Sequence, residues 1–215
     1  MYPPRTFPPQ QYPDAFAAPW GGDFSRLSAP SPGPVGMGAF AGPPSTLTPY
    51  RGVDHSVKAI QRAVLSGRGA WSPKVRLAAE KICERVAPKD YLSEILALRY
   101  WVLWHCPYFR DPRHVEWVRD PEAMLTTIEQ SPTGVVRCDC DENTGLLAAL
   151  WCAGGNDVDI VTVAFDPWPA PATHVFLRCA IPGVKGQWVV TDPVAGTKET
   201  FMLQKARRFW IYPLN

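Results

Sequence analysis

The sequence lacks several features that would assign a protein class at once. It has only 6 cysteines in 215 residues, too few for a disulfide scaffold. Its 22 Lys and Arg residues nearly balance 20 Asp and Glu residues, and a formal net charge of +2 gives no electrostatic argument for binding nucleic acid or an anionic membrane. No stretch of 18 residues is uniformly apolar, and the N-terminus has no basic region followed by an apolar core. We therefore expect no nucleic-acid partner, no membrane span and no signal peptide, and hence synthesis in the cytoplasm.

Proline is concentrated at one end of the chain. Of the 24 prolines, 12 lie in residues 1–50. Proline removes backbone donors, so we expect residues 1–52 to form an extended arm without a core or a strand ladder. Aromatic residues are spaced along this segment, with Phe16, Trp20 and Phe24 as candidate anchors. The two open interpretations are an arm that docks on another subunit and a disordered tail with incidental aromatics.

Residues 53–215 are predicted to form one domain in which helices precede strands. Capping residues and apolar periodicity predict helices, and β-branched and aromatic runs predict strands. The expected helices are 54–65, 73–86, 91–105, 121–129 and 140–153, and the expected strands are 158–165, 174–181, 187–191 and 208–212. This order indicates an α+β fold, with helices packed on an antiparallel sheet.

The densest group of reactive residues is the run from Arg137 to Glu142. Asp139 and Glu142 have the spacing of a capping box, which makes Cys140 the first residue of an apolar helix. The N-terminal end of a helix favours a thiolate and offers N–H groups to an oxyanion. The neighbouring acids oppose a second negative charge, so a cationic partner is required.

His174 and Asp192 are candidates for the rest of such a site. His174 begins one predicted strand and Asp192 ends the next, so antiparallel pairing would place them side by side. A thiol, an imidazole and a carboxylate form an activated nucleophile, a general base and an orienting acid. Each residue alone is more simply explained by packing or turn formation; the combination in this order favours catalysis.

Three motifs in this order resemble the transglutaminase-like superfamily. The resemblance covers about residues 90–195 and rests on Cys140-Asp141-Glu142 with its Leu/Ala-rich helix and Gly155, on His174-Val175-Phe176, and on Trp188-Val189-Val190-Thr191-Asp192-Pro193. The stretch from Tyr108 to Val118 is similar to small members encoded by tailed phages and prophages. The resemblance implies a papain-like core with a Cys140, His174, Asp192 triad that forms an acyl-thioester from an amide. Arg137-Cys138 departs from the usual glycine, but the helix register favours Cys140 over Cys138 as nucleophile.

Two functions remain open at this point. The first is a cysteine-dependent acyl-transfer enzyme that hydrolyses or transamidates an amide or isopeptide bond in a protein or peptide substrate, carried in a phage particle. The alternative is a virion structural or assembly protein that uses the fold as a non-catalytic module and binds other subunits through its arm. We expect no cofactor. The spacing of Cys138, Cys140, Cys152 and His174 does not match a zinc site, so we expect no metal.

Overall fold

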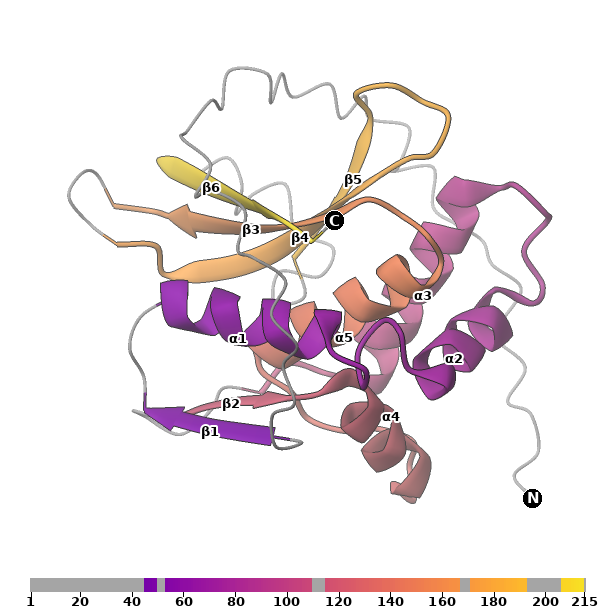
Figure 1. Ribbon diagram of the computed structural model, residues 1–215, viewed down its shortest axis with the longest axis horizontal. Helices are drawn as coiled ribbons and strands as arrows, with labels where there is room; N and C mark the ends of the chain where they lie inside the picture. The colour runs from indigo at the N-terminus through magenta and orange to yellow at the C-terminus, as the bar shows by residue number, and fades with distance from the viewer. Residues whose placement is uncertain (1–44, 50–52, 110–114, 167–170, 193–205, 215) are drawn as a thin grey trace.

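The fold is α+β, with helices packed against an antiparallel four-stranded sheet, as the sequence predicts (Figure 1). The computed structural model describes residues 45–49, 53–109, 115–166, 171–192 and 206–214. Its helices are α1 (Val53–Leu65), α2 (Pro73–Cys83), α3 (Tyr91–His105), α4 (Pro121–Gln130) and α5 (Cys140–Ala153). Its strands are β1 (Ser45–Pro49), β2 (Val115–Arg119), β3 (Val158–Ala164), β4 (His174–Ala180), β5 (Trp188–Thr191) and β6 (Arg208–Pro213).

Helices α2, α3, α4 and α5 begin at the predicted capping residues. Ser72, Asp90, Asp120 and Asp139 each accept a hydrogen bond from a backbone N–H in the first turn that follows. Such bonds satisfy donors that have no partner within the helix, which is why these residue types start helices. The prediction for α2 is three residues too long, because the chain leaves the helix after Cys83 and closes a turn in which Val86 N donates to Cys83 O.

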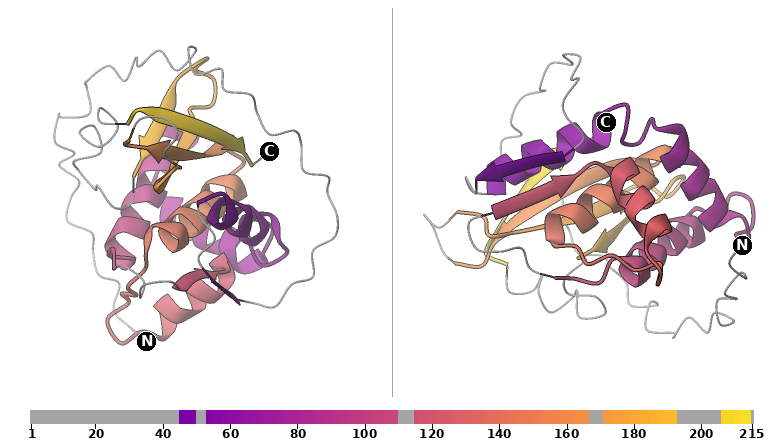
Figure 2. Two further views of the ribbon diagram at one scale, coloured as in Figure 1. Left: turned by 90° about the vertical axis from the view of Figure 1, so that its left-hand side faces the viewer. Right: turned by 90° about the horizontal axis from the view of Figure 1, so that it is seen from below.

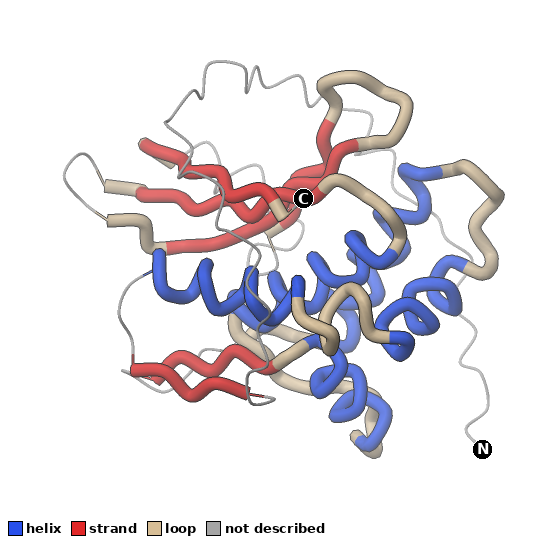
Figure 3. The backbone as a smooth tube through the Cα atoms, viewed as in Figure 1, coloured by secondary structure: helices blue, strands red, loops and turns tan. Residues whose placement is uncertain are grey.

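The main sheet has the order β5-β4-β3-β6, and all neighbours are antiparallel (Figures 1 and 3). Alternate residues of β3 face opposite sides of the sheet. Val158 and Ile160 belong to the large core shared with the helices, whereas Val161 and Val163 belong to a smaller cluster on the other face. Both faces of β3 are therefore covered, and all seven of its residues are buried.

Helix α5 is the centre of the domain. Every residue from Asp141 to Trp151 is buried, and α5 contacts all four other helices as well as β2, β3 and β4. The indole N–H of Trp151 donates to the backbone oxygen of Ile95 at 3.0 Å, which ties α5 to α3. A helix buried all round has little freedom to shift, so residues at its first turn are held firmly.

A second, two-stranded sheet was not predicted. β1 pairs antiparallel with β2, with Ser45 opposite Arg119, and the two strands lie side by side beneath α1 (Figures 1 and 2). The expectation that the proline-rich segment contains no strand is wrong for residues 45–49. The only proline of this strand is its last residue, Pro49, where a missing N–H costs the ladder least. Residues 1–44, with the predicted anchors, lie outside the described residues, and the boundary after residue 52 stays a prediction.

Within the described ranges, no helix has the length and apolar character needed to cross a membrane.

Candidate functional site

Cys140 is the first residue of α5, at the position that the capping pattern predicts. The Asp139 carboxylate accepts from the backbone N–H groups of Asp141 and Glu142, both at 3.0 Å. Asn143 adds a side-chain bond to the Asp139 carbonyl at 3.0 Å. The start of α5 is thus fixed by its own cap, and the Cys140 side chain is half-buried at this end. From the sequence we expected the free N–H groups at the start of this helix to bind an oxyanion. The N–H groups of residues 141 and 142 are not available for this, because the Asp139 carboxylate already accepts from both.

The thiol of Cys140 has a carboxylate beside it. Cys140 Sγ donates to Asp141 Oδ1 at 3.5 Å, and only 4% of Asp141 is exposed. A buried carboxylate next to a sulfur favours the neutral thiol over the thiolate. The site therefore needs positive charge nearby before this sulfur can act as a nucleophile at neutral pH.

His174 and Asp192 are neighbours at the end of the sheet. His174 Nε2 lies 2.8 Å from Asp192 Oδ2, and the exposed fractions of the two side chains are 11% and 1%. His174 is the first residue of β4, and Asp192 directly follows β5, so the antiparallel pairing of these strands brings them together. The ring of Phe165 stacks against the imidazole with centroids 6.4 Å apart. The Asp192 bond leaves Nδ1 as the other ring nitrogen, available to a second partner.

A buried arginine supports the strand that leads to Asp192. Arg99 of α3 is 2% exposed, and its Nε donates to the Thr191 hydroxyl at 2.8 Å. Thr191 is fully buried and immediately precedes Asp192. This contact fixes the end of β5 against α3 and with it the backbone that carries Asp192. Arg99 is not among the residues predicted from the sequence, although a charged residue among Ile95, Leu98 and Val102 on an apolar helix is a visible signal.

Arg119 is the second arginine that sequence reasoning missed. It ends β2, and its Nε and Nη2 bind the two carboxylate oxygens of Glu142, with 3.0 Å between Nη2 and Oε2. Burial alone would lower the pKa of Arg119, but hydrogen bonding and charge attraction to Glu142 raise it above its usual value. The two partners are 23 residues apart, so no local pattern could have paired them.

Cys138 lies in a different environment from Cys140. It is buried, and its backbone is joined to the 107–109 segment by bonds from Cys138 N to Pro107 O and from Phe109 N to Cys138 O. A hydrogen bond with Cys106, together with burial, raises the pKa of the Cys138 thiol far above its ordinary value. This difference favours Cys140 over Cys138 as the nucleophile.

Three other thiols are also held in the neutral form. Burial, with a contribution from Glu94, raises the pKa of Cys83 to about 11. Burial and the charge of Asp157 raise the pKa of Cys152 to about 12. Burial raises the pKa of Cys179 further still. Among the described residues, no group of three or more His, Cys, Asp or Glu side chains is arranged to hold a metal ion.

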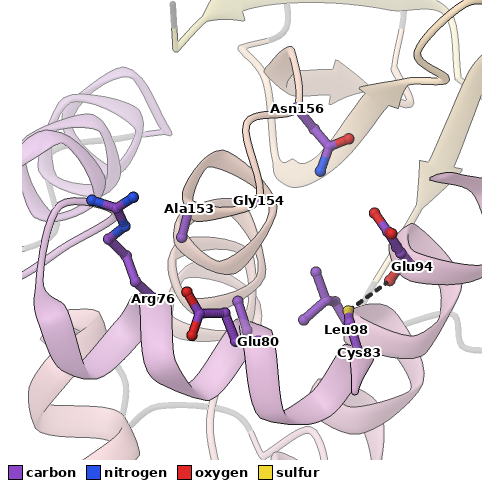
Figure 4. A pocket seen from close by; sticks show the side chains of 9 residues that line it. Arg76, Glu80, Cys83, Glu94, Leu98, Ala153, Gly154 and Asn156 are labelled. Carbon is purple, nitrogen blue, oxygen red and sulfur yellow. Dashed lines mark hydrogen bonds between the residues drawn. The ribbon is translucent and has the colours of Figure 1, made fainter. Parts of the chain in front are cut away.

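A small cavity of about 180 Å³ lies at the opposite end of α5 from Cys140 (Figure 4). Its lining residues come from α2, α3, the end of α5 and the turn that follows it: Arg76, Ala79, Glu80, Cys83, Glu94, Leu98, Ala153, Gly154 and Asn156. A 14-residue helix is about 20 Å long at 1.5 Å per residue, so this cavity is remote from the Cys140 thiol.

Comparisons with known proteins give little beyond this geometry. No family model matches the sequence, and no curated protein matches it. A crystal structure of a "putative protease" from Parabacteroides distasonis ATCC 8503 matches with a TM-score of 0.45 at 13% sequence identity. The match covers 64% of this chain and 27% of that chain, so this chain spans about a quarter of the length of that protein. Similarity at this level supports no inference about activity.

Proposed function

We propose that this protein is a cysteine-dependent acyl-transfer enzyme that acts on an amide or isopeptide bond of a protein or peptide. Cys140 is the nucleophile, His174 the general base and then acid, and Asp192 the group that orients the imidazole. The observation that carries the proposal is the 2.8 Å bond between His174 and Asp192 at the ends of β4 and β5. It is supported by the packing of α5, which begins with Cys140, against β4, which begins with His174.

The roles follow from which atoms are already engaged. Asp192 holds Nε2, so Nδ1 of His174 takes the proton from Cys140 Sγ as the sulfur bonds to the carbonyl carbon. The same proton then passes to the leaving amine nitrogen as the C–N bond breaks, which leaves an acyl-thioester. Attack by water or by a second amine breaks the S–C bond and returns a proton to the sulfur. Hydrolysis and transamidation share every step before this attack. The proposed roles agree with the transglutaminase-like resemblance of the three motifs.

A non-catalytic assembly module is the second candidate, and one observation favours it. The Cys140 thiol donates to Asp141, which is the arrangement of a neutral, unreactive sulfur. In this case the fold would serve as a packing unit in a virion, joined to other subunits through the part of the arm that precedes β1, residues 1–44. The arm carries the interaction in this proposal, and the triad residues have no chemical role.

The test is a search for acyl transfer with a matched pair of cysteine variants. The full chain is incubated with peptides that contain glutamine or asparagine carboxamides, and released ammonia and incorporated amine are measured. Cys140→Ala should abolish the activity. Cys152→Ala should retain it, because Cys152 is also half-buried on α5 but lies near the other end. Activity that survives Cys140→Ala contradicts the proposed function. A full set of inactive peptides, together with an unreactive Cys140, favours the assembly module.

A further inference from the structure

Three buried carboxylates lie at the start of α5, close in sequence to the Cys140 thiol. Asp139, Asp141 and Glu142 are 5%, 4% and 3% exposed, and all three lie within two residues of Cys140. Negative charges close to a thiol disfavour the thiolate, and low exposure reduces the screening that water would provide. The Asp139 carboxylate is bonded to two backbone N–H groups, so part of its charge is already compensated. Glu142 needs a cation.

Arg119 supplies that cation and at the same time binds the loop that precedes α5. Its Nε and Nη2 meet the two oxygens of Glu142, the geometry of a bidentate pair. Nη2 also lies 3.5 Å from the carbonyl oxygen of Arg137 and 3.7 Å from Cys138 Sγ. The side chains of Arg119 and Glu142 are 18% and 4% exposed, so the pair is largely shielded from solvent. One guanidinium thus joins the end of β2, residues 137–138 and the first turn of α5.

We infer that Arg119 is a positioning residue for Cys140: its guanidinium neutralises Glu142 and fixes the turn from residue 137 to residue 142 from which the thiol projects. This inference rests on the proposed function, in which Cys140 is the nucleophile. Arg119 acts through Glu142 and the loop, and not through the reacting atoms. A planar fork binds a carboxylate in one orientation, so a lysine can replace its charge but not its geometry.

The charged and titratable groups of the site come from six places in the fold. They are Asp139, Asp141 and Glu142 at the start of α5, Arg137 and Cys138 in the preceding loop, Cys106 after α3, Arg119 on β2, His174 on β4 and Asp192 after β5. In this set, Arg119 and His174 are the two basic side chains that the structure bonds to acids of the site. Loss of Arg119 removes positive charge from the first turn of α5, and loss of the Glu142 charge removes negative charge from the same place. The two changes should therefore move the midpoint of the Cys140 alkylation profile in opposite directions along the pH axis.

The experiment measures how the rate of Cys140 alkylation by iodoacetamide depends on pH in the full chain, with site resolution by mass spectrometry. Arg119→Met should move the midpoint of the Cys140 profile upward and slow labelling below that midpoint by about tenfold, the effect of one pH unit. Glu142→Gln should move the midpoint downward. The double variant should return close to wild type, because charge is again balanced. Arg119→Lys should retain the midpoint better than Arg119→Met.

A matched control separates this effect from the general loss of a buried ion pair. Arg178 Nε lies 2.6 Å from Asp159 Oδ2, and this pair is about as buried as Arg119–Glu142. Arg178 is four residues beyond His174 on β4, about 13 Å along the strand. Arg178→Met should leave the Cys140 profile unchanged.

The outcomes distinguish this inference from the proposed function. Unshifted profiles in Arg119→Met and Glu142→Gln, or shifts in the same direction, overturn the inference. If Arg119→Met does not fold, the downward shift in Glu142→Gln and the retained midpoint in Arg119→Lys decide the question, with circular dichroism as the check of fold. His174→Gln tests the function separately. If it leaves the wild-type profile unchanged, the proposed triad fails, whatever the Arg119 variants do.

Discussion

Selective alkylation of Cys140 is the sharpest prediction of the site. The native protein is treated at pH 8 with a limiting amount of iodoacetamide, which reacts with thiolates. Cys83, Cys140 and Cys152 are all half-buried, so access alone does not separate them. The fraction of each thiol that is ionised does separate them, because the pKa values of Cys83 and Cys152 are raised to about 11 and about 12.

The expected selectivity can be worked out from these values. At pH 8 a thiol with the ordinary pKa of about 8.5 is about one-quarter thiolate. Cys83 is then about one part in a thousand thiolate, and Cys152 about one part in ten thousand. More basic thiolates are intrinsically better nucleophiles, with a Brønsted slope of about 0.4–0.5, and this recovers part of the difference. Relative to a thiol of ordinary pKa, the net disadvantage is about 20-fold for Cys83 and about 60-fold for Cys152. We expect Cys140 to react at least as fast as this reference thiol, because in the proposed site Arg119 offsets Glu142 and His174 activates the sulfur.

The assay resolves each cysteine by mass spectrometry after short labelling and quenching. Cys106, Cys138 and Cys179 are at most 1% exposed, so their labelling requires local opening and should be slower still. Labelling in denaturant is the control, and there all six cysteines should react at similar rates. Labelling of Cys83 or Cys152 within a few-fold of Cys140 in the native protein would refute the reasoning.

Three further predictions concern the support of the site. Asp192→Asn should slow alkylation of Cys140 by tenfold or more at neutral pH, because an amide holds His174 without a charge; a wild-type rate in stopped labelling would exclude Asp192 as an orienting acid. Trp151→Phe should lower the free energy of unfolding in urea by about 1–2 kcal/mol, since it removes the buried bond to Ile95 O, without changing Cys140 labelling. Deletion of residues 2–44 should leave thermal unfolding and thiol chemistry unchanged but abolish assembly, whereas deletion of residues 2–49 should also lower the unfolding midpoint, because β2 then loses its partner strand. Normal assembly of the shorter deletion by size-exclusion chromatography would contradict a docking arm.

The main elements of the fold could be predicted because their signals are local. An N-cap such as Asp139 or Asp120 and a turn such as Gly154-Gly155 act within a few residues, so the sequence places α5 at residues 140–153 without knowledge of the rest of the molecule. The β3-β4-β5 part of the sheet is predictable for a similar reason. Short connections between β-rich runs favour antiparallel neighbours, and this puts His174 next to Asp192.

The elements that were missed depend on partners far away in the sequence. β1 and β2 are five-residue segments separated by more than 60 residues, and neither has enough apolar alternation to indicate a strand by itself. Their pairing supplies the backbone bonds that a single segment lacks. The Arg119–Glu142 pair also depends on a distant partner. Its burial and its geometry exist only after β2 and α5 have packed together.

These missed elements bear directly on the proposed chemistry. A helix buried along eleven residues gives Cys140 a rigid base, but burial of its first turn also traps three carboxylates where water cannot screen them. The compensating cation comes from β2, and β2 is held in place by β1. Changes at β1, remote in sequence from Cys140, should therefore reach the thiol through Arg119 and Glu142. A deletion that removes β1 should raise the midpoint of the Cys140 alkylation profile in the same direction as Arg119→Met, and an unshifted profile in a folded deletion variant would show that β2 holds Arg119 without help from its partner strand.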